Sequence, residues 1–276
     1  MVYVFTNKKA SVEKTFPKNT KFQVMDKVSD HAPADKDKSF IDITGIKVQD
    51  LEKILTIIKN PSKDTPKKES SLIKTGVKFP PVNTFPGWKN ITSGKTIPFY
   101  LLYCSIHGKS SLDTRYEEKA IAQVHKRLLN YLSYIFDKSE GQLWMNSGKD
   151  CLFLFPPRAK SAEAVIEACI RMIISAPLIT MENLGISEPV NFNFALHYGT
   201  ISYKPPGKTG TVVSDAVNAI FHLGAKKSEA GRLTVSGDIP DGTIPKSLED
   251  CFVPAGVYEG RKIWHTRKFC YEKTWT

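Results

Sequence analysis

The sequence has few features of secreted, membrane-spanning or zinc-ribbon proteins. Its five cysteines are widely spaced, their number is odd, and no Cys-x-x-Cys pair occurs, which argues against a disulfide framework or a zinc ribbon. The longest apolar runs, Ile97–Cys104 and Cys151–Pro157, fall far short of the roughly 20 residues of a membrane span. The first residues lack the charged-then-apolar order of a secretion signal. We therefore expect core cysteines in a reducing compartment, a cytoplasmic location and no membrane partner.

Arginine is absent from the first 98 residues, which hold 18 Lys and 10 acidic residues. The remaining chain holds 21 basic and 18 acidic residues, so most of the net charge of +11 lies in the N-terminal part. Base and phosphate recognition favours the bidentate guanidinium of Arg over Lys. We therefore interpret the excess as a solvated Lys-rich surface and expect no nucleic-acid partner. Hydrophobic residues at 41% exclude wholesale disorder.

Composition divides the chain into three predicted segments. Residues 1–58 resemble a small βα N-terminal segment, with alternating strands and a helical stripe from Val48 to Ile58. Residues 59–96 are expected to form a Lys/Pro-rich connector, because Pro61, Pro66 and the Pro80-Pro81 pair interrupt regular structure. Residues 97–276 carry strong periodicity and are expected to form the main domain.

The order of strands and helices in the main domain predicts an α+β fold of the ferredoxin-like plan, with a mainly antiparallel sheet and helices on one face. Its order is β-α-β-β-α-β-α-β followed by a hairpin. The expected strands are Ile97–His107, Leu143–Asn146, Cys151–Phe155, Pro189–His197, Gly231–Ser236, Phe252–Gly256 and Arg261–Thr266. The expected helices are Thr114–Phe136, Ala159–Ser175 and Ser214–Ala225.

Three segments carry a more specific resemblance. They are Tyr103-Cys-Ser-Ile-His-Gly108, the hairpin Asn146-Ser-Gly-Lys-Asp-Cys-Leu-Phe-Leu-Phe155, and Ala195-Leu-His-Tyr-Gly199 with Val213-Ser-Asp-Ala-Val-Asn-Ala-Ile-Phe-His-Leu223. In this order they resemble the Phe-x-Asp-Ile-x-Gly strand, the Lys-x-x-Gly-Asp turn and the Gly-Asp-x-Val-Asn-x-Ala-x-Arg-Leu helix of the class III nucleotidyl cyclase catalytic domain. The resemblance covers roughly residues 97–240, and it implies a divergent cyclase-homology domain.

The resemblance implies a metal site in which the family uses two carboxylates to activate the ribose 3′-hydroxyl and neutralise the phosphates. Ser105 stands at the first of these positions, and a neutral hydroxyl is a weak magnesium ligand. Counting from Gly148 puts Lys149 at the second position, whereas one extra turn residue puts Asp150 there. We expect Mg²⁺ or Mn²⁺ only if a nucleotide binds, and no cofactor otherwise.

The remaining family positions are only partly kept. Asn218 matches the ribose-orienting Asn, and His222 stands in place of the Arg that stabilises the transferring phosphate. A neutral imidazole is a poor substitute for a guanidinium. Met145 and Thr211 occupy the purine-selecting positions. Each candidate also has an ordinary structural role: Asn218 as a helix cap or packing residue, His222 as a packing residue and Asp150 as a turn residue.

The resemblance implies a signalling protein with a weak or degenerate cyclase-like domain. It would bind a purine nucleoside triphosphate, or a cyclase-like partner through a homodimer or heterodimer, because family active sites combine residues of two subunits. Two alternatives stay open: an active adenylate or guanylate cyclase that releases pyrophosphate, and an interaction scaffold without a nucleotide site. His197, on an apolar strand, is expected to be a core histidine.

Overall fold

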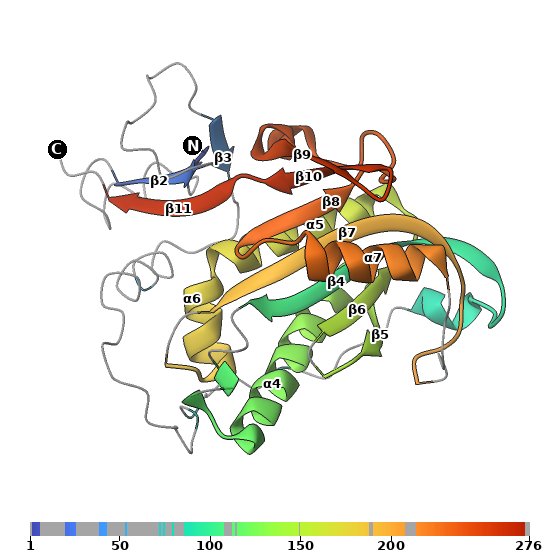
Figure 1. The fold of residues 1–276 in the computed structure, drawn as a ribbon, viewed down its shortest axis with the longest axis horizontal. Coiled ribbons are helices and arrows are strands. Elements are labelled where there is room, and N and C mark those ends of the chain that lie inside the picture. The colour runs from blue at the N-terminus through green and yellow to red at the C-terminus, as the bar shows by residue number, and fades with distance from the viewer. Residues whose placement is uncertain are drawn as a thin grey trace.

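A seven-stranded mixed sheet forms the centre of the computed structural model, in the order β5-β6-β4-β7-β8-β10-β9 (Figure 1). The structure describes residues 86–107, 115–148, 150–187, 190–207 and 214–273, strands at 2–5, 20–25 and 39–42, and the single residues Lys53, Leu72, Lys74, Phe79, Leu112 and Asp113. The sheet strands are β4 (Thr96–His107), β5 (Gln142–Asn146), β6 (Asp150–Phe155), β7 (Asn191–Ser202), β8 (Arg232–Ser236), β9 (Phe252–Tyr258) and β10 (Arg261–Thr266). Within this central sheet, β7 and β8 are the one pair of neighbouring strands that run parallel. The predicted α+β class and the mainly antiparallel sheet are therefore confirmed.

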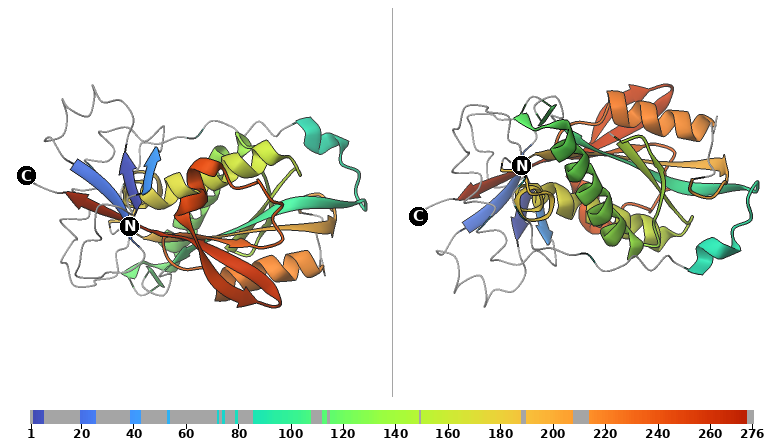
Figure 2. Two further views of the ribbon diagram at one scale, coloured as in Figure 1. Left: turned by 90° about the horizontal axis from the view of Figure 1, so that it is seen from above. Right: turned by 90° about the horizontal axis from the view of Figure 1, so that it is seen from below.

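Helices cover both faces of this sheet, which corrects the expectation that they lie on one face. Helices α4 (Glu118–Asp137) and α5 (Ala159–Ile174) cover one face, and α7 (Asp215–Lys226) covers the other (Figure 2). The physical reason is visible in β4, where alternate residues point to opposite faces. Its odd-numbered side chains from Phe99 to Tyr103 pack with α7, and its even-numbered ones from Tyr100 to Cys104 pack with α4 and α5.

The α4–α5 face carries the larger apolar core. Helix α4 buries one residue every four positions, namely Ala120, Val124, Leu128, Leu132 and Phe136, so that a single stripe faces the sheet. Phe136 packs edge-on against Phe153, with ring centroids 5.0 Å apart. Each fully buried side chain of this size contributes about 1.5–3 kcal/mol of transfer free energy.

The segment after α5 continues into α6 (Ala176–Leu178) and η3 (Ile179–Leu184). Within the described residues, no single helix is long and apolar enough to cross a membrane. Ala162–Ile174 and Ala176–Leu184 meet that length and composition test only together, as a pair bent by 68°. Residues of both parts, Ile170 and Ile179 among them, are buried in the α4–α5 core.

A second, four-stranded sheet has the order β11-β2-β1-β3. It joins β1 (Val2–Phe5), β2 (Thr20–Met25) and β3 (Ser39–Asp42) to β11 (Lys268–Lys273), the last strand of the chain. The sequence assigned β11 to the 97–276 segment, yet its pairing partner lies in 1–58. The helix expected at 48–58 and nearly all of the 59–85 stretch fall outside the described residues, so the three-segment division stays a prediction.

Two short helices complete the described fold: η2 (Pro86–Asn90) before β4 and η4 (Lys246–Cys251) before β9. Trp88 on η2 is buried and stacks on Phe99, with ring centroids 5.8 Å apart. Its indole N–H donates to the Glu140 carbonyl at 2.9 Å. The end of the predicted connector is therefore fixed to the α7 face of the central sheet.

Candidate functional site

The candidate metal residues meet on adjacent strands of the central sheet. Strand β4 pairs with β6 so that Ser105 lies directly opposite Asp150. Asp150 is thus the first residue of a strand, not a turn residue, and it occupies the place beside Ser105. Lys149, the other residue that the count allowed there, lies outside the described residues. Ser105 is buried and neutral, so this pair offers a single carboxylate.

A third side chain, which the sequence analysis did not single out, completes this cluster. The phenol of Tyr103 donates a hydrogen bond to Oδ1 of Asp150 at 2.9 Å. Tyr103 and Ser105 are two apart on β4, so both face α7. Burial raises the pKa of Tyr103 above its ordinary value, the Asp150 carboxylate raises it further, and a hydrogen bond with Ser105 opposes this. The phenol therefore keeps its proton and remains a donor to Asp150 at neutral pH.

Helix α7 holds the Tyr103 ring in this position. Phe221 packs edge-on against it, with ring centroids 6.0 Å apart and planes at 82°. Gly224 lies directly over the ring, where an added Cβ would overlap the ring carbons of Tyr103. A glycine in a helix interior costs about 1 kcal/mol relative to alanine. Here the missing side chain makes room for the tyrosine that reaches Asp150.

The two candidate catalytic residues of α7 lie one helical turn apart on its exposed side. The helix begins after Ser214, whose hydroxyl accepts a hydrogen bond from the Val217 N–H. Asn218 is exposed, so it neither caps the helix nor packs in the core. His222 is also exposed, and its Nδ1 lies 2.9 Å from Oε1 of Glu259. The packing role considered for His222 is therefore wrong.

The His222–Glu259 pair places a carboxylate at the position where the family resemblance assigns a phosphate-binding cation. The hydrogen bond from His222 lowers the pKa of Glu259, with Lys226 adding a smaller effect in the same direction. Glu259 has the left-handed backbone conformation, with φ of 48°, at the turn between β9 and β10. Its carboxylate is ionised at neutral pH, so the imidazole of His222 has an anionic partner within this chain.

The candidate purine-selecting residues are less completely placed. Met145 is half-buried on β5 and packs against the α7-side core. Thr211 lies outside the described residues. The hairpin that follows Met145 is closed by Asn146, whose Oδ1 accepts the Gly148 N–H at 2.9 Å. The structure therefore places Ser105 beside Asp150, and Asn218 on the same helix face as His222. The position of Met145 relative to Thr211 stays outside what the structure describes.

His197 is a core histidine, as the sequence analysis expected. It is buried, and its Nδ1 lies 2.7 Å from the hydroxyl of Ser236. Burial lowers its pKa to about 4, although the Asp238 carboxylate, 3.4 Å away, acts in the opposite direction. The ring is therefore neutral at pH 7 and has a hydrogen-bonding role within the sheet.

The described residues do not fit a two-metal site. No group of three or more His, Cys, Asp or Glu side chains that could hold a metal ion occurs among them. Asp150 is the one carboxylate of its cluster, and one of its oxygens accepts a hydrogen bond from Tyr103. Proteins hold Mg²⁺ through one or two carboxylates together with substrate phosphates and waters, so one carboxylate beside the neutral hydroxyls of Ser105 and Tyr103 does not supply ligands for two metal ions.

Two further expectations concern buried residues. Cys104, Cys151, Cys169 and Cys251 are free and buried, which confirms their core role, and burial raises the pKa of Cys104, Cys169 and Cys251; Cys270 lies in a strand whose side chains are not described. A nucleic-acid interface on the sheet would need exposed aromatic residues for base stacking, but six strand aromatics are buried: Phe99, Tyr100, Phe153, Phe155, Phe192 and Phe194. The sheet therefore does not present them on an open face.

Comparison with known proteins gives a structural match only. No family model and no curated protein sequence matches the chain. Among solved structures, the adenylyl cyclase CyaB from P. aeruginosa superposes with a TM-score of 0.50 at 19% identity, over 62% of this chain and 94% of that chain. The fold is that of the class III nucleotidyl cyclase catalytic domain.

Other solved cyclases align over similar lengths. The guanylyl cyclase Cya2 aligns at 16% identity, over 64% of this chain and 95% of that chain, with a TM-score of 0.49. The guanylate cyclase domain of RhGC from Catenaria anguillulae, solved in complex with GTP, aligns at 17% identity, over 65% of this chain and all of that chain, with a TM-score of 0.48. The predicted cyclase fold is confirmed by the match to CyaB.

Proposed function

We propose that this chain is a signalling protein whose cyclase-fold domain does not cyclise nucleotides and acts instead by binding a purine nucleotide and a cyclase-fold partner. The observation that carries the proposal is the hydrogen bond from Tyr103 to Asp150, opposite neutral Ser105. Cyclisation needs a metal-activated 3′-hydroxyl and neutralised phosphates. A single carboxylate that already accepts a hydrogen bond from a phenol gives neither function adequate support.

The exposed face of α7 supports the same proposal. A transferring phosphate is stabilised by permanent positive charge, and the family resemblance places that charge at His222. Here the imidazole is paired with the Glu259 carboxylate, so this position offers no permanent positive charge to a transferring phosphate. Asn218 remains exposed beside this pair and is available to orient a ribose without turnover.

Dimerisation is the second part of the proposal. In the cyclase resemblance, the metal side and the Asn side of one active site come from different subunits. This chain keeps the Asn side accessible, because Asn218 is exposed, and has lost the first carboxylate of the metal side. Its Asn218 face would complete a site whose carboxylates come from a cyclase-fold partner.

The test is a titration with a fluorescent ATP or GTP analogue, first with Mn²⁺ and then with Mg²⁺, followed by a product assay on the same samples. The proposal predicts saturable binding and no cyclic nucleotide. Cyclic product from the wild-type chain would contradict it and favour an active cyclase. Sedimentation of the same samples reports the oligomeric state, and absence of nucleotide binding would leave the partner-binding scaffold as the function.

Variants at Ser105 and His222 test whether the domain is an eroded enzyme or a scaffold. The Ser105→Asp variant restores the missing carboxylate, and His222→Arg restores the missing cation. If the fold is an eroded enzyme, the double variant gains measurable cyclic product while wild type has none. Asn218→Ala in that background would then abolish the gain, because the ribose would lose its hydrogen-bonding partner.

A further inference from the structure

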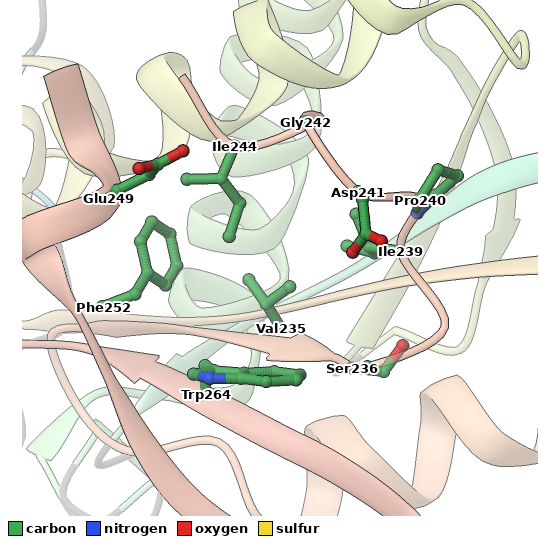
Figure 3. Close-up of a pocket in the computed structure, with 11 residues that line it drawn as sticks. Val235, Ser236, Ile239, Pro240, Asp241, Gly242, Ile244, Glu249, Phe252 and Trp264 are labelled. Atoms are coloured by element: carbon green, nitrogen blue, oxygen red, sulfur yellow. The ribbon is translucent and has the colours of Figure 1, made fainter. Parts of the chain in front are cut away.

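A cavity of about 270 Å³ lies away from the candidate site, between β8, β10 and the η4 segment. Its floor is the indole of Trp264, and Val235, Ile244 and Phe252 close its apolar sides (Figure 3). Trp264 and Val235 are directly paired on neighbouring strands, so they face the same side of the sheet. Val235 belongs to the α4–α5 core, which places the cavity on the face opposite α7.

Two carboxylates stand at the sides of this cavity. Glu249 comes from η4, and Asp241 comes from the loop after β8; Figure 3 shows them on opposite sides of the space above Trp264. Neither makes an ion pair with any other residue that the structure describes. Asp238, by contrast, pairs with Arg261 at 2.9 Å.

The charged residues that line the cavity have the opposite sign to the chain as a whole. The net charge of the protein is +11, yet both charged residues among those that line the cavity, Asp241 and Glu249, are acidic. An acidic opening over an aromatic floor favours positively charged ligands, because the indole face attracts cations and the carboxylates supply charge-assisted hydrogen bonds.

The shape limits the size of the ligand. Pockets for drug-sized molecules measure roughly 300–1,000 Å³, so 270 Å³ suits a small molecule or one side chain. Six of the residues that line the space are apolar, namely Val235, Ile239, Pro240, Ile244, Phe252 and Trp264 (Figure 3). Metal cations lack the apolar body that such walls would cover, whereas an amine or guanidine on a hydrocarbon or aromatic group fills both parts.

We propose that the cavity between Trp264, Asp241 and Glu249 binds a small organic cation, an ammonium or guanidinium group carried on an apolar body. The apolar part lies on Trp264 between Phe252 and Ile244, and the cation lies between the two carboxylates. This site is separate from the nucleotide proposal, since it lies on the other face of the sheet and shares no side chain with Tyr103, Asp150 or α7.

The test uses phenethylammonium, with phenylethanol as its neutral isostere and phenylacetate as its anionic counterpart, each titrated into the full chain by calorimetry. The proposal predicts saturable binding of the cation with a Kd below about 5 mM and binding of the alcohol at least about tenfold weaker. Nα-acetyl-arginine amide is titrated in parallel. Tighter binding of the arginine derivative identifies a peptide side chain as the source of the cation, and weaker binding identifies a free amine.

Matched variants locate the site. Glu249→Gln and Asp241→Asn each weaken phenethylammonium binding by roughly threefold to tenfold, as expected for the loss of one charge-assisted contact. Asp250→Asn is the control, because Asp250 neighbours Glu249 in sequence but does not line the cavity. All three positions are exposed, so the variants are expected to fold.

Three results would overturn the proposal. The first is no saturable binding of either cation up to about 10 mM, the second is equal affinity for phenethylammonium and phenylethanol, and the third is equal weakening by Asp250→Asn and Glu249→Gln. Ile244→Phe gives an independent check, because the larger ring fills the cavity and should abolish binding while the Trp264 fluorescence of the folded protein persists.

Discussion

The two faces of the central sheet differ in how their polar groups are used. The α4–α5 face is formed mainly by apolar side chains such as Leu102, Phe136 and Phe153. It has polar pairs as well, such as Tyr100 with Thr243 at 3.4 Å, but the cyclase resemblance assigns no chemistry to them. The α7 face also has an apolar core, but polar pairs interrupt it: Tyr103 with Asp150, His197 with Ser236, and His222 with Glu259. In two of these pairs, a position that the cyclase resemblance assigns to metal or phosphate chemistry has a partner within the chain itself.

Because of this difference, we expect substitutions on the two faces to affect different quantities, the free energy of unfolding on one face and ligand binding on the other. Substitutions on the α4–α5 face are expected to change the free energy of unfolding, because they remove apolar contacts. Substitutions at the exposed α7-side pair of His222 and Glu259 are expected to change ligand binding more than stability. The following predictions test that separation, beginning with the largest effect.

Phe136→Ala is expected to lower the free energy of unfolding by about 3–5 kcal/mol, as for other buried aromatic truncations. Phe136 is fully buried and contacts the rings of both Phe153 and Phe155. Urea unfolding followed by circular dichroism measures the change. Val257→Ala, at a side chain that is 65% exposed, is the control and should stay within about 0.5 kcal/mol of wild type; equal effects of the two variants would contradict the account of the core.

The buried histidine gives the α7 side a pH-dependent stability. The pKa of His197 is lowered to about 4 in the folded protein, below the ordinary value of about 6.5, so the unfolded chain binds more protons between these values. Stability therefore falls as the pH drops from 6.5 to 4, by about 2–3 kcal/mol. Burial lowers the pKa of His265 in the same direction. Unfolding midpoints at pH 7 and pH 5 measure the slope.

His197→Asn should make that slope smaller, since the titrating ring is removed. Ser236→Ala is the matched variant, because it removes the hydroxyl partner but keeps the imidazole and hence the slope. An unchanged pH dependence in His197→Asn would show that His197 does not cause the acid sensitivity.

Gly224→Ala tests the packing of α7 on Tyr103. In an ordinary helix this change stabilises by about 1 kcal/mol, but here the new methyl group overlaps the Tyr103 ring and should destabilise by about 1–3 kcal/mol. In a Tyr103→Leu background the same change should become neutral or stabilising. A double-mutant cycle by urea unfolding measures the coupling, and strict additivity would contradict the contact.

Glu259→Gln is expected to have the smallest effect. Its side chain is 40% exposed, so the unfolding midpoint should not change measurably. Binding of tripolyphosphate should strengthen roughly twofold to fivefold at low salt, because a negative charge leaves the α7 face, and this gain should vanish near 1 M salt, where the Debye length is about 3 Å. Glu249→Gln, on the opposite face, is the control and should leave phosphate binding unchanged.

Much of the fold could be predicted because local periodicity determines it. The helical stripe of α4 and the turn at Gly148 are visible in the sequence, and the structure places both elements within a few residues of the prediction. The prediction that all helices cover one face was wrong for α7, whereas α4 and α5 do share a face. The signal was present, since Phe99–Cys104 is apolar at every position, which is typical of a strand covered on both faces.

The candidate site was harder to predict because its partners are distant in sequence. The choice between Lys149 and Asp150 depends on the register of β4 against β6, which no local pattern fixes. Glu259 lies 37 residues from His222, and no spacing rule joins them. Tyr103 was the one available signal: it has a hydroxyl where the family strand has phenylalanine, two residues before the position of the first carboxylate.

The central claim is that Tyr103 and Ser105 leave Asp150 without a metal-binding role. Electron paramagnetic resonance of Mn²⁺ titrated into the wild-type chain and into a Tyr103→Phe/Ser105→Asp variant tests this most directly. The account predicts that wild type leaves Mn²⁺ free up to about 1 mM, whereas the variant, with two adjacent carboxylates and no phenol, binds at least about tenfold more tightly. Stoichiometric Mn²⁺ binding by the wild type at micromolar concentration, with no gain in the variant, would contradict it.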